Sequence, residues 1–262
     1  MTHLIRIELV KLRIVRAAYG LLATAAALTA LFASLEAARA GDGKNGVGPL
    51  STASGLATVT TVTGWAMLFA GVLGVMISSG EFRHGSATLT YLATPSRVRV
   101  LIAKTAAAAG IGAIFGLAAA VIATGVGLGF VAGHDYHVAL GASAIVGHAA
   151  GAILGAALLA AVGVGVGSLV RFQLAGVIGI FVWGIVIESL LGGLFTAIRP
   201  YLPYTAATTL AGIKLGGAAF GPAHGVSGGS PLPFAAAAGL VAAVAVLISA
   251  AAARSTVQRD IS

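Results

Sequence analysis

The chain is a succession of long apolar runs separated by short polar breaks. An α-helix needs about 20 predominantly apolar residues to cross the hydrocarbon core of a bilayer, and six runs approach or exceed that length. The pattern therefore predicts an all-α, polytopic membrane protein with a single transmembrane domain over residues 1–262. Its six transmembrane helices are expected at about 17–35, 56–78, 105–132, 138–170, 172–197 and 234–253.

Composition supports the same class of protein. Hydrophobic residues make up 58% of the chain and charged residues 8%, and the mean hydropathy is +1.03. A soluble domain with these values would have too little polar surface to cover itself. The net charge of +8 does not indicate a nucleic-acid partner, because the basic residues are scattered through the polar breaks. Because the chain contains no cysteine, a disulfide framework and thiolate metal sites are excluded.

The positions of the basic residues predict the orientation. Cytoplasmic loops of membrane proteins carry an excess of Lys and Arg. If the N-terminus lies inside, only four of the 15 basic residues fall in outer loops: Arg39, Lys44, Arg199 and Lys214. Both termini are therefore expected in the cytoplasm. Residues 1–16 mix basic and apolar side chains and are expected to form an interfacial helix, although they could equally be a basic flank of the first span.

One polar island stands out between the second and third spans. Gly80 to Lys104 reads GEFRHGSATLTYLATPSRVRVLIAK. Its charged residues and its single Pro95 predict a short cytoplasmic helix from Glu81 to about Leu92, within a compact element over 80–98.

This island resembles the coupling helix of the type 2 ABC exporter permeases, where a pattern like E-x-x-x-G-[ST]-x-x-x-L-x-x-P-x-R-R joins the second and third spans. The matching residues are Glu81, Gly85, Ser86, Leu89 or Leu92, Pro95, Arg97 and Arg99. Members of that family often begin with an E-x-x-K-x-R-like interfacial helix, which Glu8, Lys11 and Arg13 fit.

The resemblance implies a permease subunit of a bacterial ABC exporter in the cytoplasmic membrane. Separate ATPase subunits would bind ATP and Mg²⁺ and dock under the coupling helix, and a second permease copy or a related chain would complete the transporter. Transport would follow alternating access. The ATPase contact is assigned to Glu81, Phe82, Arg83, His84, Gly85 and Ser86.

The chain lacks the motif needed to hydrolyse ATP itself. A P-loop requires G-x-x-x-x-G-K-[ST], and the only Lys followed by Ser or Thr is Lys104, which has Ala103 before it. We therefore expect a transport subunit that is not an enzyme and holds no cofactor. Few charges lie in the spans, which favours an amphipathic or hydrophobic substrate such as a drug, an antibiotic or a lipid-like molecule.

A long outer segment precedes the last span. Residues 198–233 contain five prolines, and within them residues 205–220 are apolar but too short to cross a bilayer. Such a stretch is expected to be re-entrant or interfacial. The resembling family has external or re-entrant helices at this position.

The resemblance implies a substrate path formed largely by the second and fifth spans, and the candidate residues for it are Thr60, Thr63, Met67, Phe181 and Glu188. Threonine hydroxyls in membrane helices commonly bond back to a carbonyl one turn earlier, so lining a polar path is one of two interpretations. A carboxylate inside a span costs about 2.5–3.5 kcal/mol on insertion scales and should face protein or water. Glu188 is either a functional group or a protonated glutamic acid bonded to a neighbouring helix.

Two other classes of function remain open. An ion- or proton-coupled secondary transporter could use Glu188, although the halves of the chain lack a convincing inverted repeat. A membrane metalloenzyme could use His134, His137 and His148 with Asp135. The histidines lack a further active-site context, so no metal site is predicted.

Glycines recur four residues apart in the middle spans, a spacing that allows close approach of membrane helices. The pairs are Gly112/Gly116, Gly125/Gly129, Gly151/Gly155 and Gly163/Gly167.

Overall fold

The computed structural model describes residues 16–40, 48–83, 97–170, 172–213 and 230–258, and all regular structure in these ranges is helical. Six helices are long and apolar enough to cross a membrane, which confirms the expected all-α class. They are Ala17–Arg39, Ala53–Gly80, Val98–Gly133, Ala142–Val170, Gln173–Leu194 and Phe234–Arg254.

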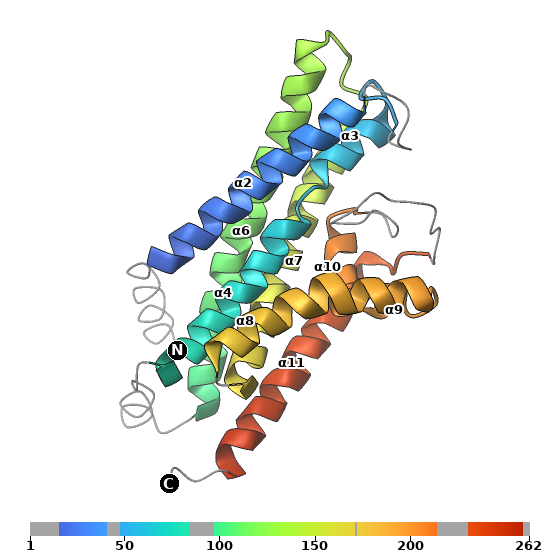
Figure 1. Ribbon diagram of the computed structural model, residues 1–262. Coiled ribbons are helices and arrows are strands. Elements are labelled where there is room, and N and C mark those ends of the chain that lie inside the picture. Colours follow the sequence, from blue (N-terminus) through green and yellow to red (C-terminus); the bar gives the residue numbers. More distant parts are fainter. Residues whose placement is uncertain (1–15, 41–47, 84–96, 171, 214–229, 259–262) are drawn as a thin grey trace.

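These helices are built from the following elements (Figure 1). The chain order is α2 (Arg16–Arg39), α3 (Ala53–Thr60), α4 (Gly64–Arg83), α6 (Arg97–Gly133), α7 (Ala142–Val170), α8 (Gln173–Phe181), η1 (Val182–Ile187), α9 (Glu188–Leu194), η2 (Arg199–Tyr201), α10 (Pro203–Leu210) and α11 (Phe234–Gln258). The element η1 is a π-helical turn, and η2 is a 3₁₀ turn.

Several helices differ from the spans expected from hydropathy. The second is broken at residues 61–63, and the fifth contains the π turn. The helix α6 begins eight residues before the expected span, because the basic residues that precede the apolar run are also helical. Its 37 residues give a length of roughly 55 Å, well beyond the ~30 Å hydrocarbon core of a bilayer.

The helices α4 and α7 form the centre of the bundle, and α2, α6, α8 and α11 pack around them (Figure 1). In the most apolar window of the second span 83% of residues are buried, against 17% in the first, fifth and sixth. The second span is therefore a central helix, and the outer three present much of their apolar surface outward.

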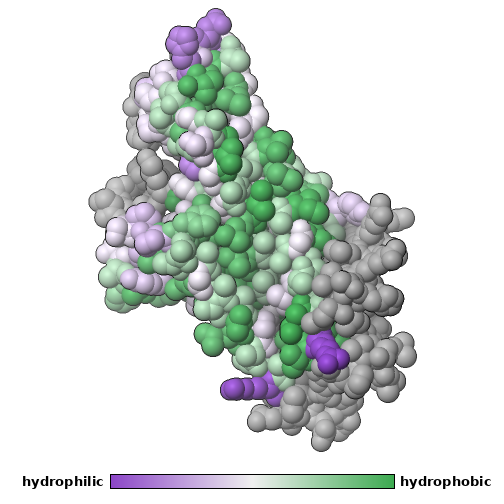
Figure 2. Space-filling view, turned by 180° about the vertical axis from the view of Figure 1, so that it is seen from behind, coloured by the Kyte–Doolittle hydropathy of each residue, from purple (hydrophilic) through white to green (hydrophobic). Residues whose placement is uncertain are grey.

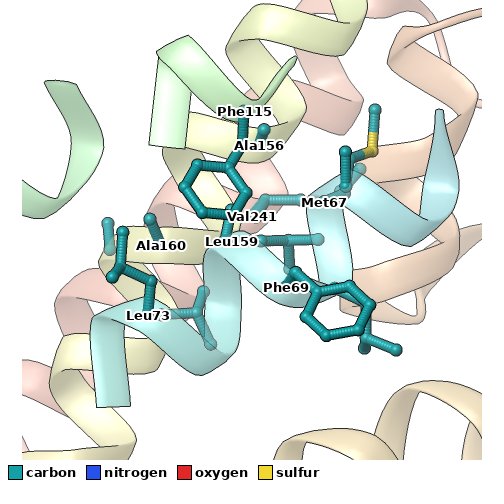
Figure 3. Close-up of a cluster of buried hydrophobic side chains, with 14 of the residues drawn as sticks. Met67, Phe69, Leu73, Phe115, Ala156, Leu159, Ala160 and Val241 are labelled. Atoms are coloured by element: carbon teal, nitrogen blue, oxygen red, sulfur yellow. The ribbon is translucent and has the colours of Figure 1, made fainter. Parts of the chain in front are cut away.

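Small residues let the central helices approach closely. Figure 3 shows Phe115 and Met67 beside Ala156, Leu159 and Ala160 of α7 in the buried cluster.

Three of the four glycine pairs lie at helix contacts. Added Cβ atoms at Gly112 and Gly116 would meet the α7 backbone, those at Gly163 and Gly167 would meet the α4 backbone, and those at Gly151 and Gly155 would meet α10. By contrast, a Cβ placed at Gly125 or Gly129 would meet no described atom within 4 Å apart from the backbone of its own helix and its chain neighbours.

The outer surface is apolar around the middle of the molecule. Figure 2 shows hydrophobic residues across the middle of one face, with the most hydrophilic residues near its ends. The helix formed by α8, η1 and α9 exposes large side chains, including Leu174 at 60% and Leu194 at 74%. This distribution is compatible with a multi-pass membrane protein.

The two ends of the bundle differ in what they carry. Figure 1 places the end of α4, the start of α6 and the end of α11 at one end, and α3 with the α6–α7 connection at the other. The short helix α10 packs against α7 and α11, away from the end where α4 finishes.

Candidate functional site

Three irregular points of the chain meet at one place, which we name the α10 junction: residues 61–64, Trp183, Glu188, Tyr204 and Thr205. The points are the break between α3 and α4, the π turn η1, and the start of α10. At each of them backbone groups leave the regular helical hydrogen-bond pattern, so the junction needs other partners.

Glu188 supplies those partners for α10. One carboxylate oxygen, Oε1, accepts hydrogen bonds from Trp183 Nε1 and from the Tyr204 backbone N–H, both at 2.8 Å. The other, Oε2, accepts from the Thr205 N–H at 2.8 Å and from the Thr205 hydroxyl at 2.9 Å. The residue is 3% exposed. Four donors of its own chain therefore surround this buried carboxylate.

The sequence at the start of α10 explains why a distant residue caps it. The N-cap residue Leu202 has no side-chain acceptor, and Pro203 occupies the first turn. Pro203 lacks an N–H group, so the next free donors are Tyr204 and Thr205. A negative charge at the N-terminus of a helix is also favoured by the helix dipole. Glu188 thus provides the cap that the local sequence lacks.

The π turn places Glu188 beside Trp183. The backbone N–H of Glu188 donates to the Trp183 carbonyl, five residues earlier, and the Trp183 indole donates back to the Glu188 carboxylate. The two residues are therefore joined by both backbone and side-chain bonds.

Threonine hydroxyls satisfy the carbonyls around the break in the second span. Thr61 donates to the Ala57 carbonyl at 2.8 Å, and Thr60 donates to the same carbonyl at 3.2 Å. Thr63 donates to the Thr61 carbonyl at 3.4 Å. Thr60 and Thr61 thus bond back to a carbonyl of the preceding turn, which is one of the two interpretations of these hydroxyls, whereas Thr63 bonds to a carbonyl only two residues earlier.

Thr60 has a second partner on α7. Its hydroxyl lies 3.2 Å from His148 Nδ1. On the other side of the imidazole lies Gly212, just after α10, with a φ of 81°. A Cβ there would lie 2.7 Å from His148 Cδ2, so this position requires glycine both for its backbone angle and for the close approach.

Tyr204 connects α10 to the second span. Its hydroxyl donates to the Gly64 carbonyl at 3.0 Å, and the side chain is 7% exposed. Burial raises the pKa of the Tyr204 phenol, and the nearby Glu188 carboxylate raises it further. The phenol therefore stays protonated and keeps its donor role.

The remaining residues of the expected substrate path lie close to this junction. Met67 is fully buried and would contact a Cβ at Gly155, while Phe181 packs edge-on against Phe69 with ring centres 5.6 Å apart. Thr60, Thr63, Met67 and Glu188 are all buried within the chain, and Phe181 is partly buried.

The residues expected at the ATPase contact are only partly covered by the structure. Glu81, Phe82 and Arg83 form the last turn of α4. His84, Gly85 and Ser86 lie outside the described residues, as do most of the expected coupling helix and the interfacial segment at residues 1–15.

The sequence pointed to Glu188 but missed its partners Trp183, Tyr204 and Thr205. A signal was present in Leu202-Pro203, where a proline at a helix start follows a residue that cannot cap.

A membrane metalloenzyme, the remote alternative, would need His134, His137 and His148 to gather with Asp135. Within the described ranges there is no group of three His, Cys, Asp or Glu residues that could hold a metal ion. His134 bonds instead to the Phe130 carbonyl at 2.9 Å and stacks on Tyr136.

No protein-family model matches this sequence, and no curated protein sequence matches it significantly.

Proposed function

We propose that this chain is the permease subunit of an ABC-type exporter, driven by separate ATPase subunits. The observation that carries the proposal is α10, an eight-residue helix too short to cross a membrane. Its residues are largely buried against α7, α11 and α4, and its start is bonded to Glu188 of the fifth span. Non-helical backbone is tolerated at membrane depth only where protein or a water-filled cavity surrounds it. A re-entrant segment before the last span is the arrangement that the resemblance to type 2 ABC permeases implies.

The order of elements supports the same reading. The end of α4 and the start of α6, which flank the polar island of residues 80–98 in the sequence, lie at the opposite end of the bundle from α3 and the α6–α7 connection (Figure 1). With both termini in the cytoplasm, this island faces the cytoplasm, where ATPase subunits are available. Glu81 and Arg83 would contact them, and conformational change would pass along the central helix α4.

A second permease copy, or a related chain, would complete the transporter in the bacterial cytoplasmic membrane. The substrate would be an amphipathic or hydrophobic molecule, moved between the two copies by alternating access. ATP and Mg²⁺ would be held by the ATPase partners.

The alternative of an ion- or proton-coupled carrier has no observation in its favour. The Glu188 carboxylate is surrounded by four donors of its own chain, which account for it without a transported ion.

Co-purification from the native host in mild detergent tests the proposal. We expect a stoichiometric P-loop ATPase bound to the wild-type chain and lost in the Glu81→Gln and Arg83→Gln variants. Arg254→Gln, which removes an exposed charge from α11, is the matched control and should keep the partner. A chain that purifies without an ATPase, or substrate transport unchanged in both variants, would refute the permease assignment.

A further inference from the structure

Trp183 and Glu188 are bonded although their spacing would separate them on a regular helix. Residues five apart on an α-helix point about 140° away from each other around the axis. The π turn η1 widens the helix by one residue and brings the pair onto one face, where Trp183 Nε1 lies 2.8 Å from Glu188 Oε1. The contact therefore depends on the helical register of the fifth span.

The same register determines whether Glu188 reaches α10. Three of its four donors belong to α10, namely the Tyr204 N–H, the Thr205 N–H and the Thr205 hydroxyl. If residues 182–187 became regular α-helix, the carboxylate would turn away from Trp183 by about 100°. Single π turns within α-helices occur frequently at functional positions.

The two ends of α10 are held differently. At its C-terminal end, backbone meets backbone, because a Cβ at Gly151 of α7 would collide with the Leu210 carbonyl. At its N-terminal end, side chains make the attachment, through Glu188 and through the hydroxyl of Tyr204. A change in the fifth span can therefore release Glu188 from the start of α10 without disturbing the backbone contact at Gly151.

We propose that Glu188 is a positioning residue that docks α10 onto the fifth span, and that η1 is the two-state element controlling it. In the π register Glu188 binds the start of α10, and in the α register it releases that end. The consequence for transport, namely that α10 moves during substrate passage, rests on the proposed function. The docking of α10 by Glu188 does not depend on the proposed function.

The chain contains no cysteine, so a single introduced thiol can report on α10. Thr208→Cys places it on α10 at a position that is 6% exposed, and Ala119→Cys places a reference thiol in α6 at 1% exposure. The rate of reaction with N-ethylmaleimide is measured on the full chain in lipid nanodiscs. This readout needs no ATPase and no transport, so its outcome is independent of the permease assignment.

Loss of one charge-assisted hydrogen bond changes an equilibrium about tenfold or more. In Glu188→Ala we expect the thiol at position 208 to react about tenfold faster or more, while the thiol at position 119 is unchanged. Glu188→Gln keeps one acceptor oxygen and should give a smaller increase. Glu36→Gln on α2, where the carboxylate lies 3.3 Å from Arg39, is the matched control and should change neither rate.

Trp183→Phe separates positioning from simple capping. It leaves Glu188 and every α10 donor in place and removes only the bond that fixes the carboxylate on the fifth span. We expect the thiol at position 208 to react about threefold faster or more, a smaller effect than in Glu188→Ala because the lost bond lies within the fifth span and not on α10. An unchanged rate in Glu188→Ala, an equal increase at position 119, or a wild-type rate in Trp183→Phe would each overturn the proposal.

Discussion

The Tyr204 hydroxyl donates a hydrogen bond to the Gly64 carbonyl over 3.0 Å, linking α10 to the first residue of α4 across 140 positions of sequence. Gly64 directly follows the break in the second span, and the backbone N–H of Tyr204 donates to Glu188. The bond therefore connects the central helix of the bundle with the fifth span through α10.

Replacing Tyr204 by Phe should weaken this connection. The ring keeps its packing, but the bond to Gly64 is lost, at an expected cost of about 1 kcal/mol. Thermal unfolding of the purified protein in detergent measures the effect. Tyr201→Phe is the control, because the Tyr201 side chain is 58% exposed, and it should leave the midpoint unchanged. Equal midpoints for wild type and Tyr204→Phe would contradict a stabilising role of the bond.

The same comparison has an expected pH dependence. Burial raises the pKa of Tyr204 in the folded protein, whereas the unfolded chain ionises near pH 10. The contribution of the phenol is therefore fully present below about pH 10 and is lost as the pH rises further. The stability difference between wild type and Tyr204→Phe should be constant from pH 6 to 9 and should shrink above pH 10.

Two glycine substitutions should have opposite signs. In Gly151→Ala the new Cβ meets the Leu210 carbonyl of α10, a backbone atom that cannot rotate away, so overpacking should cost about 1–3 kcal/mol. Gly125→Ala on α6 meets no described atom within 4 Å and should stabilise the helix by about 0.5–1 kcal/mol. Thermal unfolding of both variants checks the signs. Destabilisation of similar size in both would show that the contact with α10 is not the cause.

Hydropathy was sufficient to predict the all-α class and the six long apolar helices, because burial in lipid requires uninterrupted apolar runs. It could not predict the break at residues 61–63. Around the break, threonine hydroxyls donate to the Ala57 and Thr61 carbonyls, and Tyr204, from a distant part of the chain, donates to the Gly64 carbonyl. A window that averages hydropathy does not register such compensation.

The sequence predicted the central residue of the candidate site, Glu188, but not its partners. Glu188 stood out because a carboxylate inside a span needs partners. The expected bonding of this residue to a neighbouring helix agrees with the contacts to α10, in which its two carboxyl oxygens act as acceptors. The identity of the partners depends on the π turn, and spacing read at 3.6 residues per turn places Trp183 on a different face from Glu188. The register of the fifth span was the missing piece of information.

Deletion of single residues tests that register directly. Removing Val186 leaves Trp183 and Glu188 four residues apart, so a regular α-helix would hold them on one face. Val186 is 46% exposed, so little packing is lost. We expect the deletion variant to keep the thiol at position 208 as protected as in the wild type.

Removing Ile178 instead is the control. It shortens the same helix by one residue that is 51% exposed, but it leaves Trp183 and Glu188 five residues apart. That variant should lose protection of α10, because the shortened helix must either convert the π turn into regular α-helix or rotate α8 away from α4. Equal labelling rates in the two deletion variants would show that the spacing of Trp183 and Glu188 does not control the docking of α10.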